Sequence, residues 1–501
     1  MNDKLLARLA SLSPKQRELL EKQLLKKQQT ADEGSVSIPT VSRDRDEYEL
    51  SYTQTRMWWA DQLEPGNAAY IIPVGVRFRG DLDPALLEQS LNACIKRHEA
   101  LRTTVHTKEE GHPVQRVAPA LHLPIPLVDL SHMPEGDKQV EEQRLAVETC
   151  STPFQLHELP LIRTRLLRMR TDEHLWVVAV HHIIFDGWST GVFVQEVATM
   201  YETLKRGGTI SLPPVPVQVI DYAAWQRDYL TEERIQKQVS YWQKKLQRPF
   251  PVLELPIDHP RPGVRTYTGR HYNLFLTDGL PEAVNEMSRR EEVTLFVTMM
   301  AAFQTLLYRY TALEDIIVGF PISGRGSSEI HGSIGAFINS LALRSHVTAE
   351  MSFRDLLQQV RERTMEGFEH QDVPFEMVLD AVQPERVPGH TPVFQVMFNL
   401  NKTVAPIQLT GLEMEYELID HQAVKFDISL SIRTSDDTIW CTFEYNSDLF
   451  EEETVRLLAE QYGNILRAVA DNPNQALAEI DTLSTDEIDI VAALGLFDAL
   501  E

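Results

Sequence analysis

The sequence predicts a mixed α/β or α+β fold built from two lobes of similar size. The chain has 501 residues, which is longer than a chain that folds around a single hydrophobic core usually is. Segments with strand periodicity and segments with helix periodicity alternate along most of it, and no repeat with a period of about 20 to 50 residues interrupts them. A proline cluster at residues 213–216 divides this alternation into two halves.

The composition excludes several classes of protein. A hydrophobic fraction of 43% and a charged fraction of 24% are typical of soluble globular proteins. No apolar run reaches the roughly 18 residues of a membrane helix, and charges interrupt the first leucines, so no secretory signal is predicted. We therefore expect a cytoplasmic protein without a membrane partner. The net charge of -25 argues against nucleic acid, which needs a concentrated positive surface.

The three cysteines do not suggest a metal site or a bound cofactor. Cys94, Cys150 and Cys441 are far apart in the sequence and lie in segments with helix or strand patterns. None belongs to a CxxC pair, and we assign none of them a histidine partner. We expect buried or idle thiols.

The first half of the chain is expected to contain a helical segment and one lobe. In residues 1–46, leucines recur on one helical face and a polar linker follows. Residues 47–216 form the first lobe. Within it, the continuous apolar run at 175–180 is typical of a strand buried on both faces. The segment after residue 187 has the apolar spacing of a helix.

The second half is expected to repeat this mixed character over residues 217–482. It contains a long helical pattern near 295–310, an apolar strand at 315–320 and an alternating strand near 424–432. The acidic and apolar tail at 483–501 is either a short docking segment for a partner subunit or a linker remnant. A cleft between two lobes is a usual place for a substrate site.

One segment joins a buried strand to residues that can carry chemistry. The strand ends in His181 and His182, and a turn through Asp186 and Gly187 follows. Successive side chains of a strand point to opposite faces, so at most one imidazole faces a given cavity. An imidazole suits a general base because it titrates near neutral pH, although paired histidines at a strand end are more often structural. Asp186 either faces His182 or forms an ion pair that shapes the turn.

The run 181–187 fits every fixed position of the HHxxxDG motif and resembles the condensation domains of nonribosomal peptide synthetases. Further segments resemble other motifs of that family in the expected order, so the resemblance covers about residues 45 to 480. These segments are 50–58, 97–103, 221–226, 334–344 and 370–376. The last motif, at 386–394, departs from the usual arginine, aspartate and serine pattern before its proline.

The resemblance implies both a fold and an activity. The fold would be two chloramphenicol-acetyltransferase-like lobes in a V, with a tunnel between them reached from opposite faces. The activity would be an acyltransferase reaction that joins a carrier-bound acyl or peptidyl thioester to a carrier-bound amine. Its partners would be donor and acceptor carrier proteins with their phosphopantetheine arms, and other synthase subunits through the terminal segments. Such domains serve secondary metabolism, including antibiotic biosynthesis.

The resemblance also implies roles for the residues around the motif. His182 would be the catalytic residue and His181 a structural one. Asp186 would form an ion pair with Arg325 from the second lobe. Gly187 would leave room for the thioester, and its alternative role is that of a simple turn residue at a helix start.

Other residues are weaker candidates for support of the site. Arg97 and Arg102 are rival partners for Asp186, with ordinary surface or helix charge as their alternative role. Asn339 and Ser340 are candidate supporting residues from the fifth motif.

The resemblance implies direct transfer without an acyl-enzyme, and no GxSxG turn surrounds the nearby Ser189. A thioester is already activated, so the enzyme mainly supplies alignment, worth about 7–11 kcal/mol. His182 would orient the amine or hold the tetrahedral intermediate as much as remove a proton. The alternatives are ester formation on an alcohol, an epimerisation domain, and a recruitment module that binds carriers without catalysis. The intact histidine pair argues against a heterocyclisation domain and against a degenerate member.

Overall fold

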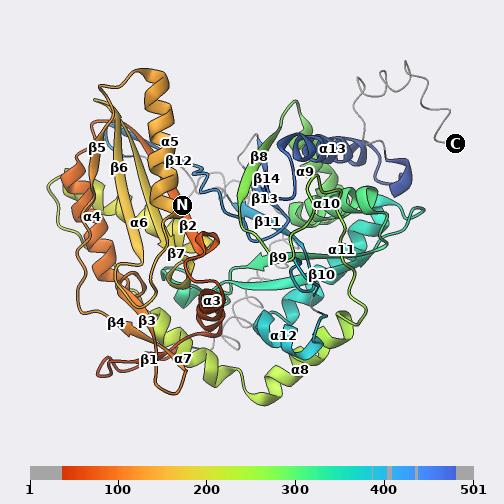
Figure 1. Cartoon of the computed structure of the whole chain (residues 1–501), viewed down its shortest axis with the longest axis horizontal. Helices are drawn as coiled ribbons and strands as arrows, with labels where there is room; N and C mark the ends of the chain where they lie inside the picture. The colour runs from red at the N-terminus through yellow and green to blue at the C-terminus, as the bar shows by residue number, and fades with distance from the viewer. Residues whose placement is uncertain (1–36, 386, 403–408, 435–437, 481–501) are drawn as a thin grey trace, which may run out of the picture.

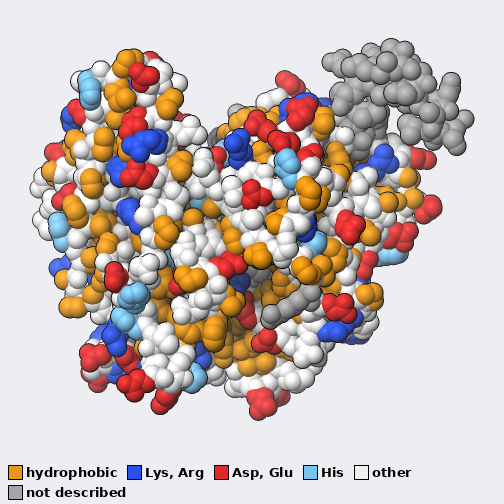
Figure 2. All heavy atoms as spheres, in the orientation of Figure 1, with side chains coloured by type: hydrophobic (Ala, Val, Ile, Leu, Met, Phe, Trp, Pro, Cys, Tyr) orange, Lys and Arg blue, Asp and Glu red, His pale blue; other side chains and the backbone are white. Residues whose placement is uncertain are grey.

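The computed structural model describes residues 37–385, 387–402, 409–434 and 438–480. These residues form two lobes, each with its own hydrophobic core, and Figure 2 shows a notch in the surface between them. The expected helical segment at 1–36 and the acidic, apolar tail lie outside the described residues. Mixed helices and sheets in two lobes agree with the predicted fold class (Figure 1).

The first lobe is built on a five-stranded sheet with β7 at its centre. The strand order is β12 (Leu412–Glu417), β2 (Ile71–Gly80), β7 (Glu173–His181), β6 (Ile162–Arg170) and β5 (Leu127–Asp129). Every residue of β7 after Glu173 is buried, as expected of its continuous apolar run. Helix α5 (Glu135–Ser151) packs on β6 and β7, and α4 (Pro84–Arg97) packs on α6 (Gly187–Lys205). The strand β7 therefore delivers the two histidines from the best-buried part of this lobe.

Three helices and a small sheet complete the connection between the lobes. The small sheet has the order β1 (Tyr48–Glu49), β4 (Pro113–Val117) and β3 (Thr103–Thr107). Helix α3 (Tyr52–Leu63) lies between the lobes, and α7 (Val219–Tyr229) and α8 (Glu232–Lys245) run from the first lobe to the second (Figure 1). Ser51 begins α3 with a capping box, in which its hydroxyl accepts the N–H of Gln54.

The second lobe contains a six-stranded sheet. Its order is β10 (Asn339–His346), β9 (Asp315–Ile322), β11 (Val396–Lys402), β13 (Ile428–Thr434), β14 (Ile439–Asn446) and β8 (Gly269–Leu276). Its helices are α9 (Leu280–Arg290), α10 (Leu295–Thr311), α11 (Phe353–Glu369), α12 (Phe375–Val382) and α13 (Glu452–Asp471). The predicted long helix and apolar strand are present as α10 and β9. The alternating strand begins later than expected, at Ile428, because the N–H groups of Val424 and Asp427 bond to Tyr267 and Gln395 outside the sheet.

The sheet of the second lobe has two unlike faces. In β13, Ile428, Leu430 and Ile432 are buried, and Ser429 and Ser431 between them are half-buried. Helices α9, α10, α11 and α13 lie on the side away from the first lobe (Figure 1). The apolar side chains pack under these helices, so the polar side chains of the strand face the first lobe.

Two segments of the second half return to the first lobe. Strand β12 pairs antiparallel with β2, and Ile334 and Phe337 belong to the first lobe's core. These segments were expected in a contiguous second lobe at 217–482. They lie in the first lobe instead and tie the two lobes together. In the described part of the chain, no helix has the length and apolar character needed to cross a membrane.

Candidate active site at the end of β7

His181 is held inside the first lobe. It is the last residue of β7 and pairs with Ile71 of β2. Its Nδ1 accepts the N–H of Ile183 at 3.1 Å, and its ring meets the edge of Phe154 with 6.3 Å between centroids. Burial lowers the pKa of His181 to about 3. This imidazole is therefore neutral and engaged in packing.

His182 has a different environment at the boundary of the lobes. It opens a short 3-10 turn, His182–Ile184, and is half-buried. Its Nδ1 is buried and has no hydrogen-bond partner among the described residues. Burial, and after it the charge of Lys425, hold the pKa of His182 well below its usual range. The ring is thus a neutral imidazole with one buried nitrogen that has no described partner.

Asp186 forms a buried ion pair with Arg325 from the second half of the chain. Arg325 Nη2 lies 3.1 Å from Asp186 Oδ1, and the two residues are 5% and 1% exposed. Asp186 also begins α6, because its Oδ1 accepts the N–H of Ser189 at 2.8 Å. Its Oδ2 accepts the N–H of Phe337 at 3.1 Å. Of the two alternatives for this carboxylate, the structure contains the ion pair.

Gly187 is exposed at the start of α6. A Cβ built on it meets no atom within 4 Å, and its φ is not in the left-handed region. Neither packing nor backbone strain requires a glycine here. The space beside Gly187 is free, and its use by a substrate stays a prediction.

For the reaction that the resemblance implies, we expect Gly187→Ala to lower amide formation by about tenfold or more while leaving the free energy of unfolding unchanged or slightly higher. Alanine suits a helix better than glycine by about 0.5–1 kcal/mol, and the added methyl group would occupy the space that the thioester needs. Urea denaturation and single-turnover rates measured on the same samples check both parts. A variant with the full rate would show that Gly187 only starts the helix.

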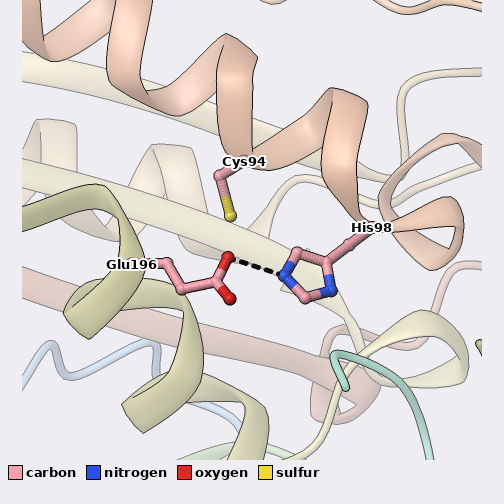
Figure 3. Close-up of side chains that lie close together, drawn as sticks. All are labelled: Cys94, His98 and Glu196. Atoms are coloured by element: carbon pink, nitrogen blue, oxygen red, sulfur yellow. Dashed lines mark hydrogen bonds and ion pairs between the residues drawn. The ribbon is translucent and has the colours of Figure 1, made fainter. Parts of the chain in front are cut away.

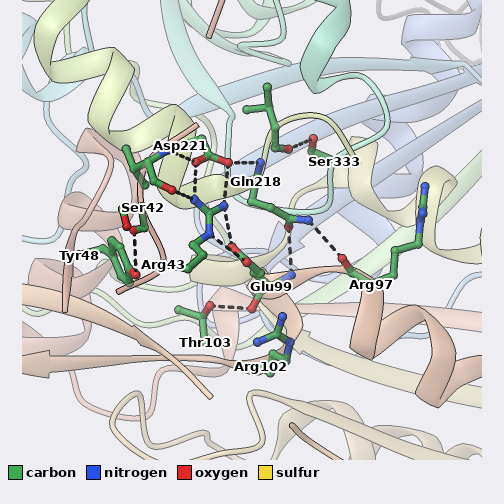
Figure 4. Close-up of polar contacts among 12 residues, drawn as sticks. Ser42, Arg43, Tyr48, Arg97, Glu99, Arg102, Thr103, Gln218, Asp221 and Ser333 are labelled. Carbon is green, nitrogen blue, oxygen red and sulfur yellow. Dashed lines mark hydrogen bonds and ion pairs between the residues drawn. The ribbon is translucent and has the colours of Figure 1, made fainter. Parts of the chain in front are cut away.

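Arg97 and Arg102 do not hold Asp186. Arg97 Nε donates to Glu196 at 3.0 Å, and Arg102 donates to the carbonyl of Ala118. Figure 4 shows Arg97 joined to Gln218, whereas Arg102 lies nearby without a dashed line to the residues drawn. There the amide of Gln218 donates to the carbonyl of Arg97 at 3.2 Å. The structure thus gives both arginines structural contacts.

Asn339 and Ser340 connect two of the sequence motifs. The amide of Asn339 donates to the carbonyls of Gln371 and Val373 at 3.0 and 2.9 Å. Its oxygen accepts the N–H of Ser340 at 2.8 Å and that of Phe375 at 3.1 Å. These bonds fix the first turn of α12 against β10.

Cys94, His98 and Glu196 form a cluster that the sequence reasoning missed (Figure 3). Their ligand atoms lie within 4.8 Å of one another. His98 Nε2 lies 2.8 Å from Glu196, while its Nδ1 accepts the N–H of Ile334 at 3.4 Å. The proton therefore belongs on Nε2, and burial raises the pKa of the Cys94 thiol. A metal binds a thiolate and an unprotonated imidazole nitrogen, and here the thiol and the Nε2 that faces Glu196 carry their protons. The cluster instead ties α4 and α6 to the segment around Ile334, which returns to the first lobe.

Two cationic residues near His182 also escaped prediction. Arg56 on α3 lies 3.2 Å from Glu376 on α12, across the lobe boundary. Lys425, just before β13, places its Nζ 4.4 Å from the ring centroid of Tyr70. Arg56 lies in the segment 50–58, which resembles the first family motif, so the motif could have indicated this residue. A single lysine such as Lys425 carries no such signal.

Sequence comparisons identify related proteins. A family model described as the condensation domain matches residues 44–489. The chain is 41% identical over 455 residues to one of the linear gramicidin synthase proteins of Brevibacillus parabrevis, covering 90% of this chain and 6% of the relative. It is 36% identical to phosphinothricin tripeptide synthetase PhsC from Streptomyces viridochromogenes, covering 96% of this chain and 44% of the relative. The chain thus spans less than half the length of these relatives.

Solved structures of the same fold include a complex of the X-domain and OxyB from teicoplanin biosynthesis. The TM-score is 0.78 at 25% identity, and the match covers 90% of this chain and 99% of that one. The first condensation domain of the calcium-dependent antibiotic synthetase, in complex with a substrate analogue, gives a TM-score of 0.77 at 22% identity, with coverage of 87% and 99%. These matches agree with the two-lobed arrangement of helices and sheets described above.

Proposed function

This chain belongs to the condensation-domain family, and on that basis we propose that it joins a carrier-bound acyl or peptidyl thioester to an amine on a second carrier. The observation that carries this proposal is His182, in an intact HHxxxDG motif. Its imidazole is neutral, half-buried and lacks a described hydrogen-bond partner at Nδ1. A group of this kind can orient an amine and accept its proton.

Direct transfer is supported by the surroundings of Ser189, the hydroxyl closest to the motif in sequence. Its Oγ donates to Asp186 at 2.7 Å and accepts from Arg325 at 3.1 Å. It also contacts the backbone of Gly335, and Ser189 has 0% exposure. A fully buried hydroxyl that is engaged in these hydrogen bonds is a poor nucleophile. We therefore assign no covalent acyl-enzyme to the reaction.

The reaction then depends mainly on alignment. The amine nitrogen adds to the thioester carbonyl, the carbon–sulfur bond breaks, and one amine proton ends on the leaving sulfur. A free amine with a pKa near 8 is partly neutral at physiological pH. His182 would orient the amine so that its lone pair faces the carbonyl carbon, and it would pass one amine proton to the leaving sulfur. Asp186 and Arg325 would keep the turn in place.

The partners in this proposal are a donor and an acceptor carrier protein. Their phosphopantetheine arms would reach His182 from opposite faces through a tunnel between the lobes, and the notch in Figure 2 supports access from one of them. The terminal segments would contact other synthase subunits. The cytoplasm remains the predicted location.

The test uses the chain with a donor-loaded carrier and an acceptor carrier that bears either an amine or a hydroxyl group. Products released from the carriers are identified by liquid chromatography and mass spectrometry. We expect the amide. Transfer only to the hydroxyl would favour ester formation instead.

A recruitment module is the second candidate, because one structural relative is an X-domain in complex with OxyB. Carrier binding without transfer to either acceptor would favour this candidate and contradict the enzyme.

A further inference from the structure

Lys425 of the second lobe reaches the immediate neighbourhood of His182. Its Nζ lies 4.4 Å from the ring centroid of Tyr70 in the first lobe. Tyr70 directly precedes β2, whose first residue Ile71 pairs antiparallel with His181. Tyr70 ends a 3-10 turn and His182 begins one, so each residue lies one position beyond this pair. The ammonium on the Tyr70 ring is therefore close enough to the proposed catalytic imidazole for its charge to lower the pKa of His182.

The other cations of this region are already engaged. Arg325 is paired with Asp186, and Arg56 with Glu376. The guanidinium of Arg265 donates to the backbone carbonyl of Lys425. In the described part of the chain, no ion pair or hydrogen bond joins a carboxylate to Lys425 Nζ, whose contact is the Tyr70 ring. Lys425 thus brings a positive charge that is not neutralised by a direct partner.

The charged groups around Lys425 come from several elements. Burial and the charge of Arg56 lower the pKa of Lys425 to about 7, and Glu444 on β14 opposes this shift. Other titratable neighbours are Tyr70, whose ring the ammonium contacts, and three histidines whose own pKa values are lowered by burial and by Lys425, namely His181, His182 and His421. Near neutral pH, Lys425 is therefore present in both its charged and its neutral form.

This arrangement is unfavourable for folding. In the unfolded chain lysine binds its proton up to a pKa near 10.4, but in the folded chain Lys425 releases it near 7. Below the unfolded pKa the unfolded state binds more protons, so the stability rises with pH between the two values and is reduced below them. A half-buried charge that is retained at a cost in stability near the proposed catalytic imidazole is typical of a functional residue.

Resting on the proposed function, we propose that Lys425 is a second catalytic residue, whose ammonium binds the carbonyl oxygen of the donor thioester. When the amine nitrogen adds to the carbonyl carbon, the π-electron pair moves to the oxygen beside this ammonium. His182 takes a proton from the nitrogen, the carbon–sulfur bond breaks as the carbonyl re-forms, and the thiolate receives that proton. Positive charge aimed at the oxygen where negative charge develops is often the largest single contribution to catalysis.

The experiment compares Lys425→Met, Lys425→Arg and Lys205→Met in single-turnover amide formation. Lys205 ends α6 and also lies over a tyrosine ring, 5.8 Å from the centroid of Tyr201, so Lys205→Met is a matched control. We expect Lys425→Met to lose about 10²-fold or more in rate. Lys425→Arg should stay within about tenfold of the unsubstituted chain because it keeps the charge, and the control should be unchanged.

Two further readouts separate this role from a structural one. Above pH 7 the unsubstituted chain should lose rate relative to Lys425→Arg, because lysine with a pKa of about 7 becomes neutral there while arginine stays charged. In urea denaturation at pH 7, Lys425→Met should be at least as stable as the unsubstituted chain, because it removes a buried charge.

Full activity of Lys425→Met would overturn the proposal. A loss of rate in both Lys425 variants together with a loss of stability would overturn it as well, because Lys425 would then only hold the lobes together. If the unsubstituted chain formed no amide with any carrier pair, the proposed function itself would fail. That outcome differs from a failure of the Lys425 proposal, because the Lys425 variants are judged by their rates relative to an active unsubstituted chain.

Discussion

Replacing His182 with alanine is expected to lower the single-turnover rate of amide formation by about 10²–10⁴-fold, the usual contribution of a positioned acid–base group. The imidazole is neutral because burial and Lys425 lower its pKa, and its Nδ1 has no described protein partner. Its removal should therefore affect the reaction more than the fold. Rates are measured with saturating donor and acceptor carriers.

Carrier affinity and stability are the controls for this prediction. Calorimetric binding of both carriers should stay close to that of the unsubstituted chain, because His182 is half-buried and offers little surface to a carrier protein. A His181→Asn variant should mainly lower the free energy of unfolding, because His181 accepts the N–H of Ile183 and packs against Phe154. Unchanged product formation by His182→Ala would remove this residue from the reaction.

Arg325→Met is expected to lower the free energy of unfolding by about 3–5 kcal/mol, the usual effect of removing one partner of a buried ion pair. It leaves the carboxylate of Asp186 buried without its cation. It also removes the donor that satisfies the carbonyls of Ile330 and Ser333. Urea denaturation of the purified chain measures the loss.

The matched control is Arg144→Met on the outer face of α5. Arg144 pairs with Glu141 and Glu148 but its side chain is 56% exposed. Exposed ion pairs contribute about 0–1 kcal/mol, so this variant should be nearly as stable as the unsubstituted chain. Equal stabilities of the Arg325 and Arg144 variants would contradict a structural role for the buried pair.

Local periodicity predicted those elements whose burial follows from their own residues. The apolar run at 175–180 became part of β7, and the patterns near 295–310 and 315–320 became α10 and β9. The pairing of β12 with β2 was not predicted, because a short alternating strand does not specify which of two sheets it will join.

The site was predictable where a motif describes it. The ion pair between Asp186 and Arg325 joins residues 139 positions apart, and the family resemblance, not the residue pattern, supplied it. Neither source indicated Lys425 or the contact of His98 with Glu196. Their environments arise when distant segments pack together, and a single lysine or glutamate in a sequence does not reveal its neighbours.

Time-resolved mass spectrometry of all the intact proteins in one single-turnover reaction tests the central claim most directly. The acyl mass should leave the donor carrier and appear on the acceptor carrier, while the mass of this chain stays constant throughout. An acceptor carrier that gains no mass, or a chain that transiently gains the acyl group, would contradict direct transfer at His182.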